Sequence, residues 1–324
     1  MLFLTKKDIQ AVFSMAEAIE ADKQALRMYT EGKSTVPLRT NIEAQKGQNL
    51  FMPAYVSEIN TSGIKIVSVF PDNPKLGKPA VPAQMLLLDG ETGEVSALLD
   101  GTYLTQLRTG AVQGAATDLL AKKDASFAVL IGAGGQAESQ LEAMITVRDL
   151  KQVAVMDLNK ELAQNFVDRM NEKFPDVEIF ISQDNDADIA QADIITAVTT
   201  APVAVFDGSL VKPGCHINGI GSYTKDMKEL PLEAIVKADI LAVDTFSGVF
   251  AEAGDVMEAL AQDLVKEQDF IELGQLVLEP QLGRQDDTQI TLFNSVGTAV
   301  LDVVVAKAIY DKAKSLDKGQ EITI

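Results

Sequence analysis

The stretch FAVLIGAGGQAESQLEAM, residues 127–144, decides how this chain folds. A short apolar run, typical of a buried strand, leads directly into a glycine-rich turn and then into a helical pattern. Gly132, Gly134 and Ala137 have the spacing G-x-G-x-x-A. In such a turn the first glycine permits the tight bend, the second lets the backbone approach a pyrophosphate, and the alanine lets helix pack closely on strand. The stretch therefore predicts a dinucleotide site at a helix N-terminus.

The next predicted strand, QVAVMD, ends in Asp157, which lies 20 positions after Ala137. An acid at this place binds the ribose hydroxyls of a dinucleotide and repels a 2′-phosphate. No arginine follows it in Asp157–Asn159, so we expect NAD, while Lys160 keeps NADP open as a cofactor. Asp157 has a second interpretation, as the N-cap of the following helix, and Asn159 could fill that role instead.

Short apolar runs alternate with helix-length segments through the same region: SFAVLIG, QVAVMD, VEIFIS, DIITAV, CHINGIG and DILAVD. This alternation predicts a parallel sheet that is covered by helices on both faces. The first third of the chain differs. It has two capping-box patterns, Thr5 with Asp8 and Ser14 with Glu17, followed by extended segments and a hairpin near Gly90.

The tail TLFNSVGTAVLDVVVAKAIYDKAKSL reads as a strand and a long amphipathic helix that does not continue the alternation. We expect it to return to the first domain. The predicted fold class is α/β, a Rossmann doubly wound parallel sheet inserted into an α+β domain. The expected domains are residues 1–118 with 298–324, for substrate binding and dimerisation, and residues 119–297, for NAD(P).

Composition excludes several classes of function. A net charge of −19 over 324 residues argues against a nucleic-acid partner, which needs a basic surface. One cysteine and one histidine exclude a disulfide framework and a His/Cys metal site, and the acidic stretch SQDNDADIAQAD reads as a solvated loop that caps a helix. We therefore predict no metal. No apolar run is long enough for a membrane span and the start does not resemble a secretory signal, so we expect a cytoplasmic protein.

Three cations lie in unusual surroundings. Arg108 is in LTQLRTGAVQGAATDLL among small and apolar residues, Lys65 is in the strand pattern GIKIVSVF, and Arg39 follows VPL. Arginine binds carboxylates through two hydrogen bonds, and a desolvated lysine can transfer protons near neutral pH. The alternatives are a solvated or core-paired arginine and an edge-strand lysine. Asp302, on the apolar tail helix, is either a contact of the active site or a polar anchor of the core.

The single histidine and cysteine have a structural interpretation. His216 and Cys215 lie in CHINGIG, a central-strand pattern without an activating motif. A packed histidine and an inert buried thiol are the expected roles.

The segments FMPAY, GIKIVSVFP, ALLDG, LTQLRTGA, IGAGGQA, HINGIGSYTKDMKEL and LFNSVGTAVLD occur in this order. In this order, and over nearly the whole chain, they resemble the ornithine cyclodeaminase and mu-crystallin family. The resemblance implies a first domain that binds a small amino or imino acid, forms a homodimer and is completed by the C-terminal helix. It also implies that Arg39 and Arg108 hold the substrate carboxylate, that Lys65 works at the reacting centre, and that Met52 packs nearby.

The predicted cofactor contacts come partly from the sequence motif and partly from the family resemblance. The glycine turn and the acid predict Gly132, Gly134, Gly135, Gln136, Ala137 and Asp157, and we add Thr199. The resemblance places Thr109, Ser295, Val296 and Gly297 near the nicotinamide and its phosphates.

The chain departs from the family at one position. Members that cyclise ornithine carry an aspartate two residues after the first glycine of the segment written here GSYTKDMKEL, where this chain has Tyr223. Without that base, deprotonation of the distal amine is hindered, and a single hydride transfer becomes the easier reaction. The predicted catalytic residues are Lys65, Tyr223 and Asp226.

We therefore expect an NAD(P)-dependent oxidoreductase acting at the Cα of a small α-imino or α-amino acid. Ketimine reductase, pyrroline-2-carboxylate reductase and alanine-type dehydrogenase are the candidate activities. Ornithine cyclodeaminase, with Asp226 or Glu229 as the base, is the second expectation. A protein that binds NAD(P)H and a carboxylate ligand without rapid turnover is the third.

Overall fold

The computed structural model describes residues 1–323, which form two compact units. Unit 1 comprises Met1–Ala111 together with the chain from Thr298 onward, and unit 2 comprises Val112–Gly297. Helix α3 (Gly101–Leu120) contains the boundary and so contributes its first half to unit 1 and its second half to unit 2.

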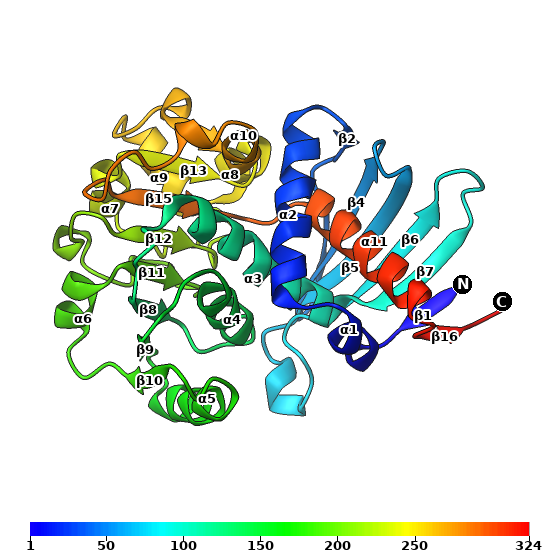
Figure 1. Ribbon diagram of the computed structural model, residues 1–324, viewed down its shortest axis with the longest axis horizontal. Helices are drawn as coiled ribbons and strands as arrows, with labels where there is room; N and C mark the ends of the chain where they lie inside the picture. Colours follow the sequence, from blue (N-terminus) through cyan, green and yellow to red (C-terminus); the bar gives the residue numbers. More distant parts are fainter. Residues whose placement is uncertain (324) are drawn as a thin grey trace. The chain divides into compact units, whose positions relative to one another are not determined.

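Unit 1 is a mixed sheet, sheet A, covered on one face by helices (Figure 1). The strand order is β16-β1-β7-β6-β5-β4-β2, and β3 pairs with β4. Helix α11 packs on β4, β5 and β6 and beside α2. The strands are β1 (Leu2–Leu4), β2 (Ser34–Thr35), β3 (Thr40–Ala44), β4 (Gly47–Val56), β5 (Thr61–Val69), β6 (Ala83–Asp89), β7 (Val95–Asp100) and β16 (Gln320–Glu321), and the helices are α1 (Lys6–Val12), α2 (Met15–Thr30), η1 (Asn73–Leu76) and α11 (Ala299–Ser315).

The local sequence explains these elements. Both predicted capping boxes are present, at Thr5 for α1 and at Ser14 for α2, and each satisfies backbone donors that a helix N-terminus leaves free. In β4 to β7 buried residues alternate with more exposed ones, as side chains of a pleated strand must. A Cβ on Gly63 would lie 3.0 Å from Cγ2 of Val303, so the parity of Gly63 is the face under α11.

Unit 2 is a parallel sheet, sheet B, with the order β10-β9-β8-β11-β12-β15-β13-β14 (Figure 1). All neighbouring strands in it pair in parallel. Because β9 and β10 extend to one side of β8 and the later strands to the other, the strand order reverses between β8 and β11. The doubly wound fold predicted from the sequence is confirmed, and dinucleotides bind such sheets at this reversal, beyond the carboxyl ends of the strands.

The elements of unit 2 alternate along the chain, with helices on both faces of sheet B. The strands are β8 (Phe127–Ile131), β9 (Gln152–Met156), β10 (Glu178–Ile181), β11 (Ile194–Ala197), β12 (His216–Gly219), β13 (Ile240–Val243), β14 (Phe270–Glu272) and β15 (Thr291–Asn294). The helices are α4 (Ala137–Val147), α5 (Lys160–Lys173), α6 (Asn185–Gln191), η2 (Gly208–Leu210), α7 (Leu232–Lys237), α8 (Phe246–Glu252), α9 (Gly254–Ala261), η3 (Glu267–Asp269), α10 (Leu273–Leu278) and η4 (Pro280–Leu282).

One expectation about the tail was wrong. Its strand, β15, lies inside sheet B between β12 and β13, and thus continues the parallel sheet. The run TLFN is buried at every residue, which is the pattern of a central parallel strand rather than of a domain linker. Only the helix that follows, α11, returns to unit 1.

Within residues 1–323, no helix is both long enough and apolar enough to cross a bilayer.

Candidate active site and nucleotide site

Lys65 lies at the centre of unit 1. It is on β5, an interior strand of sheet A, and its neighbours across the pairing are Met52 on β4 and Met85 on β6. It has the same strand parity as Gly63 and so faces α11, and it is only 1% exposed. The edge-strand interpretation of this lysine is therefore wrong. The structure also places Met52 beside it.

A carboxylate from the tail helix meets this lysine. Lys65 Nζ donates to Oδ1 of Asp302 at 2.8 Å, and Arg108 Nε lies 3.0 Å from the same oxygen. All three side chains are buried. Asp302 is thus in contact with both cations, and its role in the active site stays a prediction.

The surroundings shift the proton affinity of Lys65. The pKa of Lys65 is lowered to about 7, chiefly by burial away from water and then by the nearby charge of Arg108, while Asp302 opposes both effects. Arg39, directly before β3, adds a smaller lowering contribution to this pKa. A lysine with a pKa close to neutrality can both give and take a proton under physiological conditions.

Several buried polar atoms of this cluster have no hydrogen-bond partner among the described residues. They are Nε and Nη1 of Arg108, Oδ2 of Asp302, and both carboxylate oxygens of Asp22. Asp22 lies on the buried face of α2, and burial raises its pKa well above the usual value, with Arg108 opposing and Asp302 adding to that shift. Buried polar groups are almost always satisfied in folded proteins, so these atoms indicate a place where a polar ligand belongs.

Sequence reasoning missed Asp22. The pattern of α2 carries the only available signal, since Asp22 has the helical spacing of Ala18, Ala25 and Leu26, all of which are buried. Of the other residues predicted for this region, Arg39 is half-exposed, and Thr109 Oγ1 is buried without a hydrogen-bond partner in the described chain.

In unit 2 the glycine turn has the geometry that a pyrophosphate needs. Gly132 has φ +104°, and a Cβ there would lie 2.9 Å from the carbonyl oxygen of Val198, so this position requires glycine. A Cβ on Gly134 or Gly135 would meet nothing within 4 Å, which leaves open space above the turn. Helix α4 follows, and its N-cap residue Gln136 makes no side-chain cap. A helix start without a side-chain cap is the kind of place at which backbone N–H groups bind phosphate oxygens.

Asp157 closes the other side of this turn. Its Oδ2 accepts from the backbone N–H of Ala133 at 2.8 Å, and its Oδ1 accepts from that of Asn159 at 2.8 Å. Asn159, not Asp157, is the N-cap of α5, since its side chain accepts from Leu162 N–H at 3.0 Å. The capping interpretation of Asp157 is therefore wrong, and the acid lies against the glycine turn.

The turn from Ser295 to Gly297 follows β15 and is held by a buried acid that sequence reasoning missed. Asp244 Oδ2 accepts from Ser295 Oγ at 2.6 Å and from Gly297 N–H at 2.8 Å. Gly297 has φ +77°, a left-handed conformation that favours glycine. Asp244 ends the run DILAVD in the same way that Asp157 ends QVAVMD, and this repeated pattern was the signal available in the sequence.

The two further catalytic candidates lie in unit 2, in the segment beyond β12. Tyr223 is half-buried, and its side chain packs against the hydrophobic cluster of that unit. Asp226 is exposed. Their catalytic roles remain predictions.

His216 and Cys215 are structural, as predicted. His216 lies between Thr291 Oγ1 at 2.9 Å and Asn218 Oδ1 at 3.0 Å, and burial lowers its pKa to about 3, so it is neutral. Burial raises the pKa of Cys215 to about 12, which leaves an unreactive thiol. The acidic stretch also has its predicted form, with Asp184 as the N-cap of α6.

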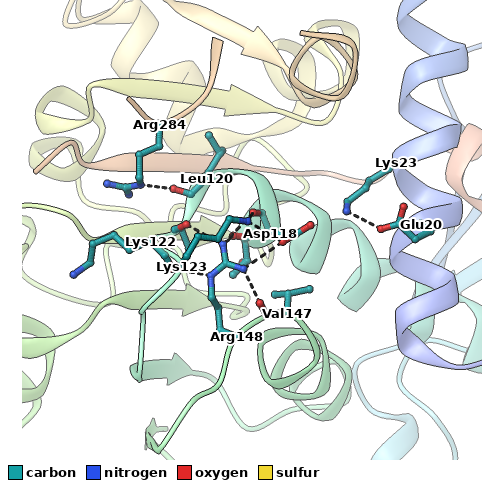
Figure 2. Close-up of polar contacts among 11 residues, drawn as sticks. Glu20, Lys23, Asp118, Leu120, Lys122, Lys123, Val147, Arg148 and Arg284 are labelled. Atoms are coloured by element: carbon teal, nitrogen blue, oxygen red, sulfur yellow. Dashed lines mark hydrogen bonds and ion pairs between the residues drawn. The ribbon is translucent and has the colours of Figure 1, made fainter. Parts of the chain in front are cut away.

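A second buried arginine, Arg148, lies at the C-terminal end of α3 (Figure 2). Its Nε donates to the carbonyl of Lys122 at 2.7 Å, and Nη2 donates to those of Thr117 and Ala121 at 2.7 and 2.8 Å. Arg284 adds a bond from its Nε to the carbonyl of Leu120 at 2.7 Å. These guanidinium groups donate to carbonyls at and just beyond the last turn of α3.

A protein-family model described as "Ornithine cyclodeaminase/mu-crystallin family" matches residues 1–317. The chain belongs to this family. It is 37% identical over 325 residues to a Delta(1)-pyrroline-2-carboxylate reductase of Bacillus cereus, and the alignment covers 99% of each chain.

Two solved structures are similar throughout their length. The Delta(1)-pyrroline-2-carboxylate reductase of Thermococcus litoralis, in complex with NADH and L-proline, has a TM-score of 0.94 at 38% identity and covers 99% of this chain and 100% of its own. An archaeal alanine dehydrogenase dimer with bound NAD has a TM-score of 0.90 at 34% identity, over 100% and 99% of the two chains. The predicted family, the NAD cofactor and the class of chemistry, oxidoreduction at a carbon–nitrogen bond, are thereby confirmed.

Proposed function

We propose that this protein reduces the carbon–nitrogen double bond of Δ1-pyrroline-2-carboxylate with NADH, giving proline. The observation that carries the proposal is the buried cluster of Lys65, Arg108 and Asp302, with its unpartnered nitrogens and oxygen. The similarity to reductases of this substrate, at 37% and 38% identity, supports the choice among imino acids.

The unpartnered donors of Arg108 fit a substrate carboxylate. Nε of Arg108 lies against Asp302, and the buried Nη1, which has no hydrogen-bond partner among the described residues, is a donor suited to a substrate carboxylate. Arg39 adds positive potential, since it is close enough to influence the pKa of Lys65. In the proposed complex both arginines hold the carboxylate, and Met52, opposite Lys65 on β4, contacts the apolar part of the ring.

Lys65 supplies the proton. Reduction of the imine places a hydride on Cα and a proton on nitrogen, so the C=N π bond is replaced by one C–H and one N–H bond. Nζ of Lys65 carries the proton in its ammonium form, and Asp302, at 2.8 Å, orients that group and stabilises its charge. Because the pKa of Lys65 is about 7, transfer and reprotonation are both accessible at neutral pH.

The nucleotide site fits NAD(H), which supplies the hydride when bound. The open space over Gly134 and Gly135 and the uncapped start of α4 suit the pyrophosphate. Asp157 suits ribose hydroxyls and disfavours a 2′-phosphate, so we propose NADH over NADPH. Thr199, Thr109 and the Ser295–Gly297 turn are proposed as further contacts.

The alternative functions differ in what they need from the chain. Cyclodeamination needs a base for the distal amine, but Asp226 is exposed and the carboxylate of Glu229 is buried and bonded to backbone N–H groups. Alanine dehydrogenase is the second candidate, because 34% identity to the archaeal enzyme supports it.

We further propose a cytoplasmic homodimer that pairs through the face of sheet A opposite α11. That face carries eight apolar or aromatic residues that are half-buried or exposed: Phe51, Pro53, Tyr55, Ile64, Ile66, Leu86, Leu88 and Leu98. They form continuous rows across the sheet, such as Pro53, Ile64, Leu86 and Leu98. A sheet with apolar side chains on both faces needs a second layer, and a copy of the same chain would supply it.

The test is a steady-state assay of NADH oxidation with Δ1-pyrroline-2-carboxylate, with pyruvate plus ammonia, and with ornithine as substrates. The expected result is turnover with the pyrroline that slows as pH rises through about 7, where Lys65 loses its proton. Lys65→Ala should abolish turnover with little change in NADH affinity, and Lys75→Ala, at a lysine whose side chain is 79% exposed, is the matched control. Full turnover of Lys65→Ala would contradict the proposed role, and proline formation from ornithine without NADH consumption would favour the cyclodeaminase.

A further inference from the structure

Unit 2 contains two buried carboxyl groups that the proposed reaction does not use. Glu229 lies between β12 and α7 and is 0% exposed, and Asp255, on the first turn of α9, is 1% exposed. Such groups are rarely buried without a reason, because desolvation of a carboxylate is costly.

Glu229 joins the chain beyond two neighbouring strands. Its Oε2 accepts from the backbone N–H of Thr199 at 2.7 Å and from Thr199 Oγ1 at 3.1 Å, and its Oε1 accepts from the backbone N–H of Gly221. Thr199 lies two residues past β11, and Gly221 two residues past β12. Three donors therefore converge on one carboxylate at the carboxyl edge of sheet B.

The two segments that Glu229 joins are in close contact. A Cβ on Gly221 would lie 1.9 Å from the carbonyl oxygen of Thr199 and 2.7 Å from Oε2 of Glu229. On its other side the same segment touches the glycine turn, since a Cβ on Gly132 would lie 3.2 Å from Cγ2 of Thr199. The position of the wall beside Gly132 is therefore set by the bonds that Glu229 accepts.

We propose that Glu229 is a positioning residue of the dinucleotide site: its carboxylate fixes the chain beyond β11 against the chain beyond β12 and so shapes the wall beside Gly132. This inference rests on the proposed use of that edge for NAD(H). A carboxylate suits the place because it only accepts hydrogen bonds. A glutamine would have to turn its NH₂ group toward an N–H donor.

The charge state of Glu229 gives the proposal a pH dependence. The pKa of Glu229 is raised to about 7, chiefly by burial and also by the charge of Asp255 on α9, against the three hydrogen bonds that lower it. The other segments that face it present Thr199 and Gly221, which are uncharged. Protonation puts a hydrogen on one carboxyl oxygen and removes an acceptor, so NADH binding should weaken as pH falls through about 7.

The experiment measures the dissociation constant of NADH by fluorescence between pH 5.5 and 9 for the wild type, Glu229→Gln and Glu258→Gln. Glu258 is the control, since it is a partly exposed glutamate on α9 that pairs with Lys228 at 2.9 Å. We expect wild-type affinity to fall on the order of tenfold on the acid side, as loss of a hydrogen bond to a charged group implies. Glu229→Gln should bind weakly at every pH, without that dependence, while kcat at saturating NADH changes less than KM for NADH.

The melting temperature of Glu229→Gln distinguishes a positioning role of Glu229 from a purely structural one. Because the pKa of Glu229 in the folded protein lies above its unfolded value, ionisation opposes folding, and stability is lost as pH rises through about 7. Glu229→Gln should therefore melt at or above the wild-type temperature at pH 8 although it binds NADH less tightly. A folded Glu229→Gln with wild-type affinity and pH dependence would overturn the proposal.

A second variant, Asp255→Asn, tests the proposal if Glu229→Gln does not fold. Asp255→Asn removes the neighbouring charge, lowers the pKa of Glu229 and should move the midpoint of the NADH-binding curve to lower pH. An unmoved midpoint, or wild-type affinity that is constant from pH 5.5 to 9, would also refute the role of Glu229. Absence of NADH binding by the wild type at all pH values would instead refute the proposed function.

Discussion

Arg108 and Arg148 are both buried, with 6% and 5% of their surfaces exposed, yet their surroundings differ in one decisive respect. The guanidinium of Arg148 gives hydrogen bonds from all three of its nitrogens to carbonyls around the end of α3 and to Asp118 (Figure 2). Arg108 has one carboxylate beside it and two nitrogens without hydrogen-bond partners in residues 1–323.

The difference separates a structural cation from a functional one. Burial alone does not identify a site. When every nitrogen of a buried arginine has a hydrogen-bond partner, those bonds offset most of the free energy lost on desolvation. When some nitrogens of a buried arginine lack partners, part of that desolvation free energy is offset only after a ligand supplies the missing acceptors. We therefore propose that Arg148 stabilises the protein and that Arg108 keeps binding free energy available for a substrate.

The largest expected effect is on Arg108. Arg108→Met should lower kcat/KM for Δ1-pyrroline-2-carboxylate by roughly 10³-fold, the size expected when one partner of a buried charged contact is removed. It should change the melting temperature little, because few hydrogen bonds are lost. Steady-state kinetics and thermal melts of the same preparation measure both. A large loss of stability with unchanged kinetics would erase the distinction between the two arginines.

The reverse pattern is expected for Arg148. Arg148→Met removes one donor each from the carbonyls of Thr117, Ala121 and Lys122, and should lower the free energy of unfolding by about 3–5 kcal/mol. Chemical denaturation measures this loss. At a temperature where the variant is folded, KM for the imino acid should stay within twofold of wild type, and a KM that rises as in Arg108→Met would contradict a purely structural role.

The smallest effect should come from Asp22, the carboxyl group of the unsaturated cluster whose pKa is raised well above its usual value. Its folded-state pKa lies above its unfolded value, so the stability that it contributes is present at low pH and lost as pH rises. Asp22→Asn should therefore melt a few degrees higher than wild type at pH 8, with the difference shrinking toward pH 4. A variant that is less stable than wild type at pH 8 would show that Asp22 is ionised and paired.

Prediction from the sequence succeeded where the pattern is local. The glycine turn, the alternating buried strands and the two capping boxes depend on neighbours within a few residues, and each was found where expected. It failed where a feature depends on contacts distant in the chain. The place of β15 inside sheet B and the contact between Lys65 and Asp302 of α11 both depend on segments far apart in sequence.

The sequence by itself determined the fold class, the family and the nature of the cofactor. The backbone geometry at Gly132 and the burial of the strands depend on residue type and spacing, which the sequence contains. The tertiary structure decided which charged groups lie together. Asp302 lies 237 residues from the lysine that it binds, and the burial of Asp22, Asp244 and Glu229 depends on the segments that pack around them in the folded chain. The pKa of a side chain and the saturation of its hydrogen bonds depend on what surrounds it in space, and that is set only when the chain has folded.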